Sequence, residues 1–160
     1  MTKLLRGQFR AKLDSKGRLL LPTPLRQNLS SSKQDKAIEL VFTNNIFKRN
    51  KFLEAYTLKG WLALEKKVAS WPTLKPEVQS YKRFYIAAGQ AVASDSQGRF
   101  LLPLGLRGFC QLEESKEVVL VGMGDKFEIW PAEIWDKLNL SMLENFESVV
   151  SVVSVLDEEA

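Results

Sequence analysis

The sequence predicts an α+β fold in which one supersecondary unit is used twice. The segment Asp-Ser-Lys-Gly-Arg-Leu-Leu-Leu-Pro-Thr-Pro-Leu-Arg at 14–26 returns 81 residues later, at 95–107, with nine of the 13 positions identical. Both copies are followed by two apolar, strand-like segments and then by a helix-like segment that contains tryptophan. The pattern of each half therefore predicts the order strand, turn, strand, short helix, strand, strand and helix. We expect the whole fold to be built from two copies of this unit.

The first predicted element is a strand over 9–14, where apolar and charged side chains alternate. This alternation places one face against a core and leaves the other face basic. Asp14 and Gly17 then stand first and fourth in a turn, the preferred chemistry of a type I turn. Gly17, like its equivalent Gly98, can take the positive φ that a bulged hairpin needs.

The return strands are predicted over 19–21 and 100–102, which are apolar throughout. Pro22 ends the first of them because proline has no N–H group for the sheet. Thr23 as N-cap and Pro24 as first helical residue then predict a short helix at the end of the repeat.

Beyond the first copy, 38–42 and 53–56 are strand-like, and we interpret the segment 48–51 between them as an inserted loop. A helix over 61–68 follows, with its charged residues on the outer face. A second connecting helix is predicted to end at a C-cap, Gly89. Its apolar positions are Val78, Tyr81, Phe84 or Tyr85, and Ala88.

In the second half, 117–122 and 127–130 are strand-like, and 132–146 has the spacing of an amphipathic helix. The run 148–156 is mostly valine, with serine at every third position. It fits either a helix with one polar face or a strand, and both interpretations stay open.

These elements divide the chain into four predicted parts. They are a first module (8–58), connecting helices (59–89), a second module (90–133), and a C-terminal helix and tail (134–160). A half of roughly 75 residues buries only a thin core alone, so we expect the two modules to pack together.

The composition argues against catalysis. The 160 residues include no histidine, which removes the usual general base and zinc ligand, and no glycine-rich phosphate loop is present. Cys110 is the only cysteine, so no disulfide framework is expected. We expect a non-enzyme without metal, cofactor or small-molecule substrate. Since no apolar run approaches the roughly 20 residues of a membrane span and no signal peptide opens the chain, we expect a cytoplasmic protein without membrane contact.

Charge is distributed unevenly along the chain. Residues 1–33 carry eight Lys or Arg against Asp14 alone, a net charge of +7. Residues 125–160 carry two Lys against nine acidic residues, a net charge of −7. A basic end of this kind is typical of a surface that binds a polyanion such as nucleic acid. An ordinary scatter of surface charge is the alternative.

Each hairpin also contains an aspartate and an arginine four residues apart, which we expect to form structural ion pairs: Asp14 with Arg18, and Asp95 with Arg99. A guanidinium has five N–H donors, so Arg18 can pair with a carboxylate and still reach a phosphate or a guanine edge. Lys16 adds a charge at the first tip, where the second copy has Gln97. We therefore expect the first copy to face the ligand and the second to be mainly architectural.

Three features together resemble the MraZ family. They are the two Asp-x-x-x-Arg hairpins, the opening Leu5-Arg-Gly-Gln-Phe9, and the segment Val119-Leu-Val-Gly-Met-Gly-Asp-Lys-Phe-Glu-Ile-Trp130. The resemblance extends from Leu5 to Leu138. It implies a tandem pair of swapped-hairpin, AbrB-like or SpoVT-like β-barrel modules with flanking helices and pseudo-two-fold symmetry. It also implies homo-oligomeric rings, often octamers.

The resemblance further implies a function. Members are bacterial transcriptional regulators that bind direct repeats in double-stranded DNA upstream of the division and cell-wall gene cluster, so a nucleoid-associated protein is expected. The family's DNA contacts fall on Lys16 and Arg18, with Arg10, Lys12 and Arg26 as flanking contacts.

The chain departs from the family pattern at the 48–51 loop, at Gly105 and Gly108 in the second short helix, and at Pro131. These departures leave the first hairpin intact. An alternative from another class is a protein-interaction scaffold whose basic face holds an acidic partner. An enzyme is a third interpretation, which the absence of histidine disfavours.

Overall fold

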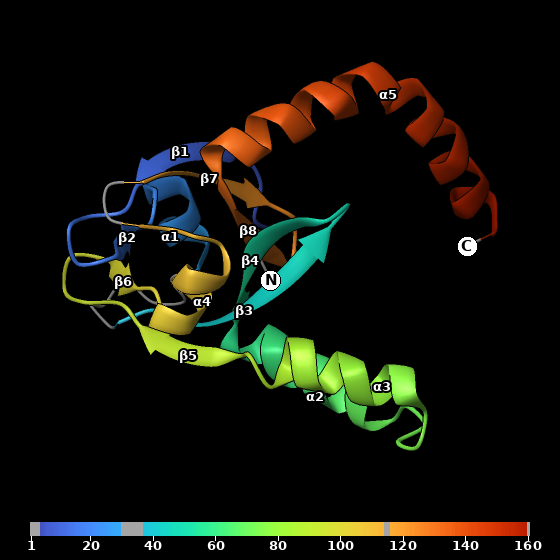
Figure 1. Cartoon of the computed structure of the whole chain (residues 1–160), viewed down its shortest axis with the longest axis horizontal. Helices are drawn as coiled ribbons and strands as arrows, with labels where there is room; N and C mark the ends of the chain where they lie inside the picture. The colour runs from blue at the N-terminus through green and yellow to red at the C-terminus, as the bar shows by residue number, and fades with distance from the viewer. Residues whose placement is uncertain (1–3, 30–36, 114–115, 160) are drawn as a thin grey trace.

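The computed structural model describes residues 4–29, 37–113 and 116–159, and its elements follow the predicted order in both halves (Figure 1). The first half contains β1 (Gln8–Lys12), β2 (Arg18–Leu20), α1 (Thr23–Leu29), β3 (Glu39–Phe47), β4 (Asn50–Thr57) and α2 (Leu58–Ala69). After α3 (Pro76–Tyr81) and a π-helix, η1 (Lys82–Ile86), the second half contains β5 (Gln90–Ala93), β6 (Arg99–Leu101), α4 (Leu104–Phe109), β7 (Glu117–Gly122), β8 (Lys126–Pro131) and α5 (Ala132–Glu159).

The two halves exchange their outer strands. A six-stranded antiparallel sheet has the order β1-β7-β8-β4-β3-β5, and a two-stranded sheet joins β2 to β6. β1 of the first half lies on β7, with Phe9 opposite Leu120, and β5 of the second half lies on β3, with Val92 opposite Leu40. The sheet therefore has the same order of equivalent strands from either edge, and each half completes the sheet of the other.

One apolar core joins both halves. It includes Leu19 and Phe100 from the two-stranded sheet, and Phe42 and Leu120 from the six-stranded sheet. The rings of Phe42 and Phe100 meet edge to face, with their centres 5.8 Å apart. Burial of this continuous cluster fixes β2 and β6 against the large sheet, so that their hairpin loops project at one end of the molecule (Figure 1).

The second connecting helix differs from the prediction of one regular helix. It continues beyond α3 as η1, in which Tyr85 is buried and Phe84 is 38% exposed. The hydroxyl of Tyr85 donates to the buried carboxylate of Glu54 at 2.7 Å, and its carbonyl accepts from the hydroxyl of Thr43 at 2.6 Å. These bonds attach η1 to the sheet through side chains that a helical pattern does not predict.

The prediction that Gly89 caps this helix is wrong, because the C-cap of η1 is Ala87. Gly89 is needed for another reason. A Cβ atom at this position would lie 2.4 Å from the ring of Trp61 in α2, well inside van der Waals contact. Gly89, which lies between η1 and β5, therefore permits Trp61 of α2 to pack closely on the chain that follows η1.

The prediction of an inserted loop at 48–51 is also wrong. β3 and β4 pair up to Phe47 opposite Asn50, and a two-residue turn joins them. Its residues, Lys48 and Arg49, have φ of 50° and 68°. Positive φ at both positions is the geometry of a tight hairpin turn, which usually takes glycine or asparagine.

The run 148–156 is helical, and α5 is continuous from Ala132 to Glu159. The hydroxyl groups of Ser151 and Ser154 donate to the carbonyls four residues earlier, at 3.2 and 2.8 Å. Trp135 and the first turns of α5 pack on the sheet, and the rest of the helix extends away from it (Figure 1).

Candidate nucleic-acid interface

Asp14 organises the tip of the first hairpin. Its Oδ1 accepts from the backbone N–H groups of Lys16 and Arg18, each at 2.9 Å, and its Oδ2 accepts from Nε of Arg18 at 2.6 Å. Gly17 completes the turn with a φ of 80°. The backbone hydrogen bond from Arg18 is the main cause that lowers the pKa of Asp14 to about 2, so this carboxylate is charged at neutral pH.

The second hairpin has the same geometry. Oδ1 of Asp95 accepts from the backbone N–H groups of Gln97 and Arg99, each at 2.9 Å, and Oδ2 accepts from Nε of Arg99 at 2.7 Å. In both hairpins the aspartate thus accepts from the backbone N–H of the arginine and, within the guanidinium, from Nε alone. Among the described residues, the Nη groups of Arg18 and Arg99 have no hydrogen-bond partner.

β2 and β6 present both arginines on one face. Arg18 stands opposite Leu101, and Leu20 stands opposite Arg99, while the residues between them point into the core. Leu20 and Leu101 are 50% and 51% exposed. The structure therefore combines two guanidinium groups with two accessible leucines, and orientation alone does not distinguish the two copies.

The two short helices place their arginines over opposite hairpins. Arg26 in α1 covers the second turn, where a Cβ on Gly98 would lie 2.8 Å from its Nη1. Arg107 in α4 covers the first turn, where a Cβ on Gly17 would lie 2.0 Å from its Nη1. Nε of Arg107 donates to the carbonyl of Leu102 at 2.9 Å, which fixes the side chain in this position.

Arg107 therefore accompanies Lys16 and Arg18, whereas Arg26 lies beside the second hairpin. Nη1 of Arg26 is 3.5 Å from the carbonyl of Gln97, at that hairpin's tip. Arg107 was not among the predicted DNA contacts. The repeat could have pointed to it, because Arg107 occupies the same place in the second copy as Arg26 in the first. The repeat alone does not show, however, that each short helix places its arginine over the hairpin of the other half.

Arg10 and Lys12 lie on β1, behind the tip. Arg10 forms an ion pair with Glu117 at 3.0 Å and a second one with Asp136 of α5. Its guanidinium is thus held by two carboxylates in the free protein. Lys12 is exposed on the same strand. The structure does not bring Arg10 together with Lys16 and Arg18.

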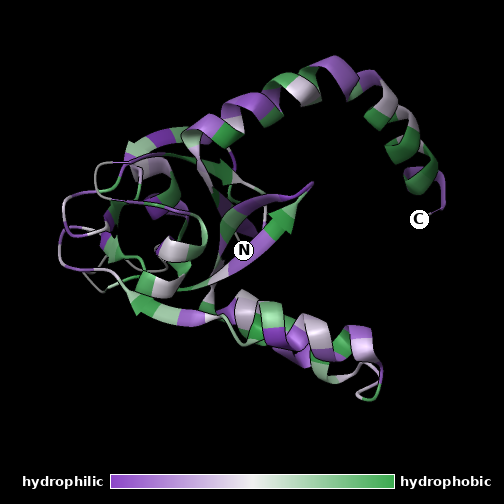
Figure 2. Ribbon diagram, in the orientation of Figure 1, coloured by the Kyte–Doolittle hydropathy of each residue, from purple (hydrophilic) through white to green (hydrophobic). Residues whose placement is uncertain are grey.

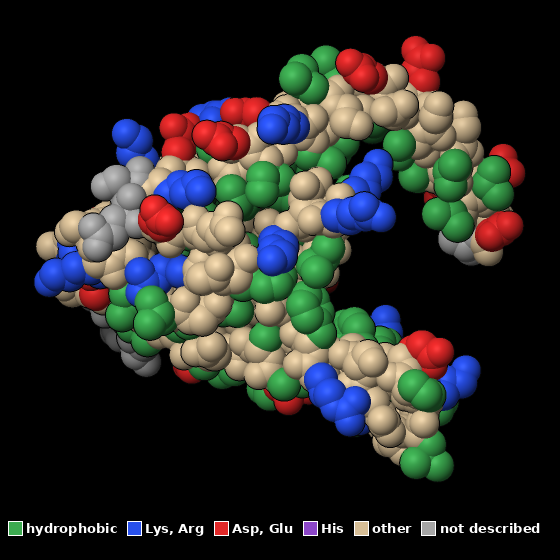
Figure 3. Space-filling model, viewed as in Figure 1, with side chains coloured by type: hydrophobic (Ala, Val, Ile, Leu, Met, Phe, Trp, Pro, Cys, Tyr) green, Lys and Arg blue, Asp and Glu red, His purple; other side chains and the backbone are tan. Residues whose placement is uncertain are grey.

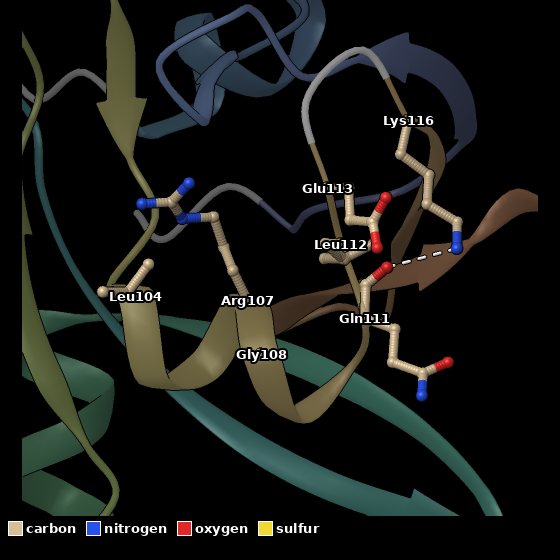
Figure 4. Close-up of a pocket in the computed structure, with 7 residues that line it drawn as sticks. All are labelled: Leu104, Arg107, Gly108, Gln111, Leu112, Glu113 and Lys116. Atoms are coloured by element: carbon tan, nitrogen blue, oxygen red, sulfur yellow. Dashed lines mark hydrogen bonds between the residues drawn. The ribbon is translucent and has the colours of Figure 1, made fainter.

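A groove of about 1030 Å³ beside α4 extends the basic surface (Figure 4). Arg107 and Lys116 lie on opposite sides of it, with Glu113 between them (Figure 4). The backbone carbonyl of Lys116 accepts from the N–H of Leu13, one residue before the first hairpin turn. Nζ of Lys116 donates to the carbonyl of Gln111 at 3.1 Å, so of these two cations Arg107 is the one that lies over the first turn. Figure 3 shows Lys and Arg side chains at the end of the molecule where the hairpin loops lie.

The described residues offer little for other chemistry. They contain no group of three or more acidic residues, cysteines or histidines placed to hold a metal ion. Burial raises the pKa of the Cys110 thiol to about 12, so it is protonated at neutral pH and a poor nucleophile. No helix in the described part of the chain has the length and apolar character to cross a membrane.

The family model and the similar proteins described next all carry one family name. A family described as "MraZ protein, putative antitoxin-like" matches residues 4–84 and 86–149. The chain is 30% identical over 151 residues to a protein of Natranaerobius thermophilus, covering 94% of this chain and 97% of that protein. It is 31% identical over 152 residues to one of Limosilactobacillus reuteri (95% and 99%) and 36% identical over 135 residues to one of Desulforapulum autotrophicum (84% and 85%). All three are named transcriptional regulator MraZ.

Proposed function

The chain belongs to the MraZ family, and from this membership we propose that it regulates transcription by binding double-stranded DNA through the tip of its first hairpin. Its relatives are named as regulators and not as catalysts. The observation that carries the proposal is Arg18, whose side chain is 27% exposed and whose guanidinium is bonded to Asp14 through Nε alone, which leaves its Nη groups available for a ligand.

The chemistry of these side chains suits DNA. A guanidinium whose position is already fixed loses little freedom on binding, and its paired N–H groups match a phosphate or the O6 and N7 atoms of guanine. Lys16 supplies a point charge for a phosphate. Arg107 and Lys116 add phosphate contacts alongside the groove. Arg99 and Arg26 lie at the second hairpin, where they bond to Asp95 and to the carbonyl of Gln97. Arg10 and Lys12 remain flanking candidates, and Arg10 has to leave its carboxylate partners to contribute.

A single tip offers few cations, so tight binding needs several tips together. We propose that copies of the chain form a ring whose tips meet successive direct repeats, and that these repeats lie upstream of the bacterial division and cell-wall gene cluster. Each additional tip then binds at a high effective concentration without a new type of contact. Such a protein would be associated with the nucleoid.

The test is a fluorescence titration with duplexes that carry one, two and four copies of a repeat selected from a random DNA pool. Affinity should rise steeply with the number of copies. If about 6–10 phosphates are neutralised, it should fall by about 10³–10⁵ between about 50 and 200 mM salt. Lys16→Ala should weaken binding and lower the salt slope by about 1 for each engaged tip. Lys66→Ala, which removes an exposed charge from α2, is the matched control.

A scaffold that holds an acidic protein on the same face is the rival function. It predicts no dependence on the number of repeats and equal, weak effects of Lys16→Ala and Lys66→Ala on duplex binding. That outcome would refute the proposed function.

A further inference from the structure

The last part of α5 exposes an apolar surface that nothing in the described chain covers. Its apolar side chains are each 44–63% exposed: Phe146, Val149, Val150, Val152, Val153, Val155 and Leu156. Figure 2 shows this hydrophobic character continuing along the final turns of the helix. The hydroxyl groups of Ser151 and Ser154 are bonded to the helix backbone, which makes the remaining face less polar as well. An exposed apolar segment of this length marks an interaction site.

The segment is also acidic. Residues 144–159, here called the tail, carry five acidic side chains and no Lys or Arg. Two tails lying together would therefore repel each other, and so would a tail and an anionic membrane surface. The charge of the tail selects a partner surface that is both apolar and basic.

The tip of the β3–β4 hairpin is such a surface. Ile46 and Phe47 are both 46% exposed, and Lys48 and Arg49 form the turn beside them. In the described chain neither cation has an ion-pair partner. A mainly apolar hollow of about 360 Å³ adjoins the tip, and its lining includes Ile46, Phe47, Phe52, Met123, Leu138 and Met142. The charged residues in its lining already have partners, since Glu54 pairs with Lys126 and Glu128 accepts from the indole N–H of Trp130, so among the described residues the unpaired charge of this surface is that of Lys48 and Arg49.

The tail does not reach this surface in its own chain. Trp135, Leu138 and Met142 of α5 line the hollow, and the helix then continues past it. The residues after Met142 extend the helix by about 25 Å at 1.5 Å per residue. In the view of Figure 1, the hairpin tip points into the space between α5 and the α2–α3 helices, and the end of α5 lies apart from it.

We infer that the tail of one copy packs on the β3–β4 tip and adjoining hollow of a second copy. The contact joins two different surfaces, so each added copy leaves one tail and one tip unoccupied until the chain of copies closes. This inference deepens the proposed function, which requires a ring, but the contact itself needs no DNA. The family match ends at residue 149, so much of the tail lies outside the part of the chain that the family describes.

The experiment measures mass by light scattering joined to chromatography, with the full chain and no DNA. The wild-type chain should exceed the 18.2 kDa of a single copy. A stop after Asn145 removes most of the tail and keeps the α5 residues that line the hollow, and it should give a folded single copy. Lys48→Asn with Arg49→Gly removes both tip charges with residues that favour this turn, so it should lower the mass without unfolding the hairpin.

Charge-reversal variants test whether the β3–β4 tip and the tail contact each other directly. Lys48→Glu with Arg49→Glu should give single copies, and adding Glu147→Lys and Asp157→Lys to the same chain should restore the assembled mass. Lys66→Glu with Lys67→Glu on α2 is the matched control and should leave the mass unchanged. A wild-type chain that stays a single copy, a shortened chain that still assembles, or a reversal that does not restore assembly would each overturn the inference.

Binding to a one-repeat duplex separates this inference from the proposed function. Single-copy tip variants that bind one repeat as the wild type does would support both. If the wild type assembles through the tail but binds no duplex, the contact stands and the DNA function fails.

Discussion

Two nearly identical hairpins differ through a few side chains at their tips. Asp14 and Asp95 hold Arg18 and Arg99 in the same way. The first hairpin differs in the charge at its tip, because Lys16 stands where the second has Gln97, whereas each turn is covered by one arginine. In the proposed function, the first copy would therefore contact DNA selectively because of the added charge of Lys16 on a shared backbone geometry.

Because the pKa values of Asp14 and Asp95 are lowered in the folded chain, we predict that the protein loses stability in acid. The pKa of Asp14 is about 2 in the folded chain, against 3.8 ordinarily, and the pKa of Asp95 is lowered by the equivalent backbone hydrogen bond from Arg99. Because the folded pKa is the lower one, this contribution is fully present above about pH 4 and is lost as the pH falls toward 2. The free energy of unfolding, measured with urea at several pH values, should decline over that interval.

Asp14→Asn with Asp95→Asn should be less stable than the wild type at pH 7 and should show a smaller decline in acid. Glu65→Gln on α2 is the control and should follow the wild-type profile. Equal declines in all three chains would remove the two aspartates as the cause.

Sequence patterns predicted both Asp–Arg pairs because their partners are four residues apart in a turn whose chemistry is local. They did not predict that Arg26 and Arg107 exchange hairpins, or that Arg10 is held by Glu117 and Asp136. Those contacts depend on strand pairing between distant segments, which a local pattern does not encode.

Among the structural elements, α2 packs against the chain that follows η1 only because position 89 has no side chain. A Cβ at Gly89 would strike the ring of Trp61, whereas a Cβ at Gly105 in α4 would meet nothing within 4 Å. We predict that Gly89→Ala destabilises the fold by about 1–3 kcal/mol, since the ring has to move. Gly105→Ala should stabilise it by about 0.4–1 kcal/mol, because alanine restricts the unfolded chain. Thermal and urea unfolding of the two variants measure this, and equal effects would contradict it.

The elements that the sequence did not settle are those with two compatible patterns. Serine at every third position of 148–156 fits a helix or a strand. In the helix, the hydroxyl groups of Ser151 and Ser154 donate hydrogen bonds to backbone carbonyls four residues earlier. Lys48 and Arg49 gave no turn signal, since residues with side chains seldom take positive φ twice in succession.

For the whole molecule, the exchange of β1 and β5 makes the two halves interdependent. A fragment ending at Thr73 lacks the strand that covers β3 and the partner of β2, and the fragment that starts at Leu74 has the corresponding losses. Neither should fold as a single copy, whereas an equimolar mixture should recover cooperative unfolding by tryptophan fluorescence. A fragment that unfolds cooperatively as a lone copy would show that the exchange is not required.

The order of elements was predictable because the repeat displays it twice, and the shared core was expected from the small size of each half. The crossing of β1 to β7 and of β5 to β3 was implied only by family resemblance, because period-two alternation specifies a face but not a neighbour.

Because the two halves that exchange strands belong to one chain, their hairpin tips need not be identical. Were the same architecture assembled from two separate copies of one short chain, every substitution would appear on both sides at once. A peptide link between the halves removes that constraint, so a substitution at one tip leaves the other tip unchanged. Lysine at one tip and glutamine at the other is a difference that only a fused chain permits, and the proposed function assigns DNA contact to the tip with lysine.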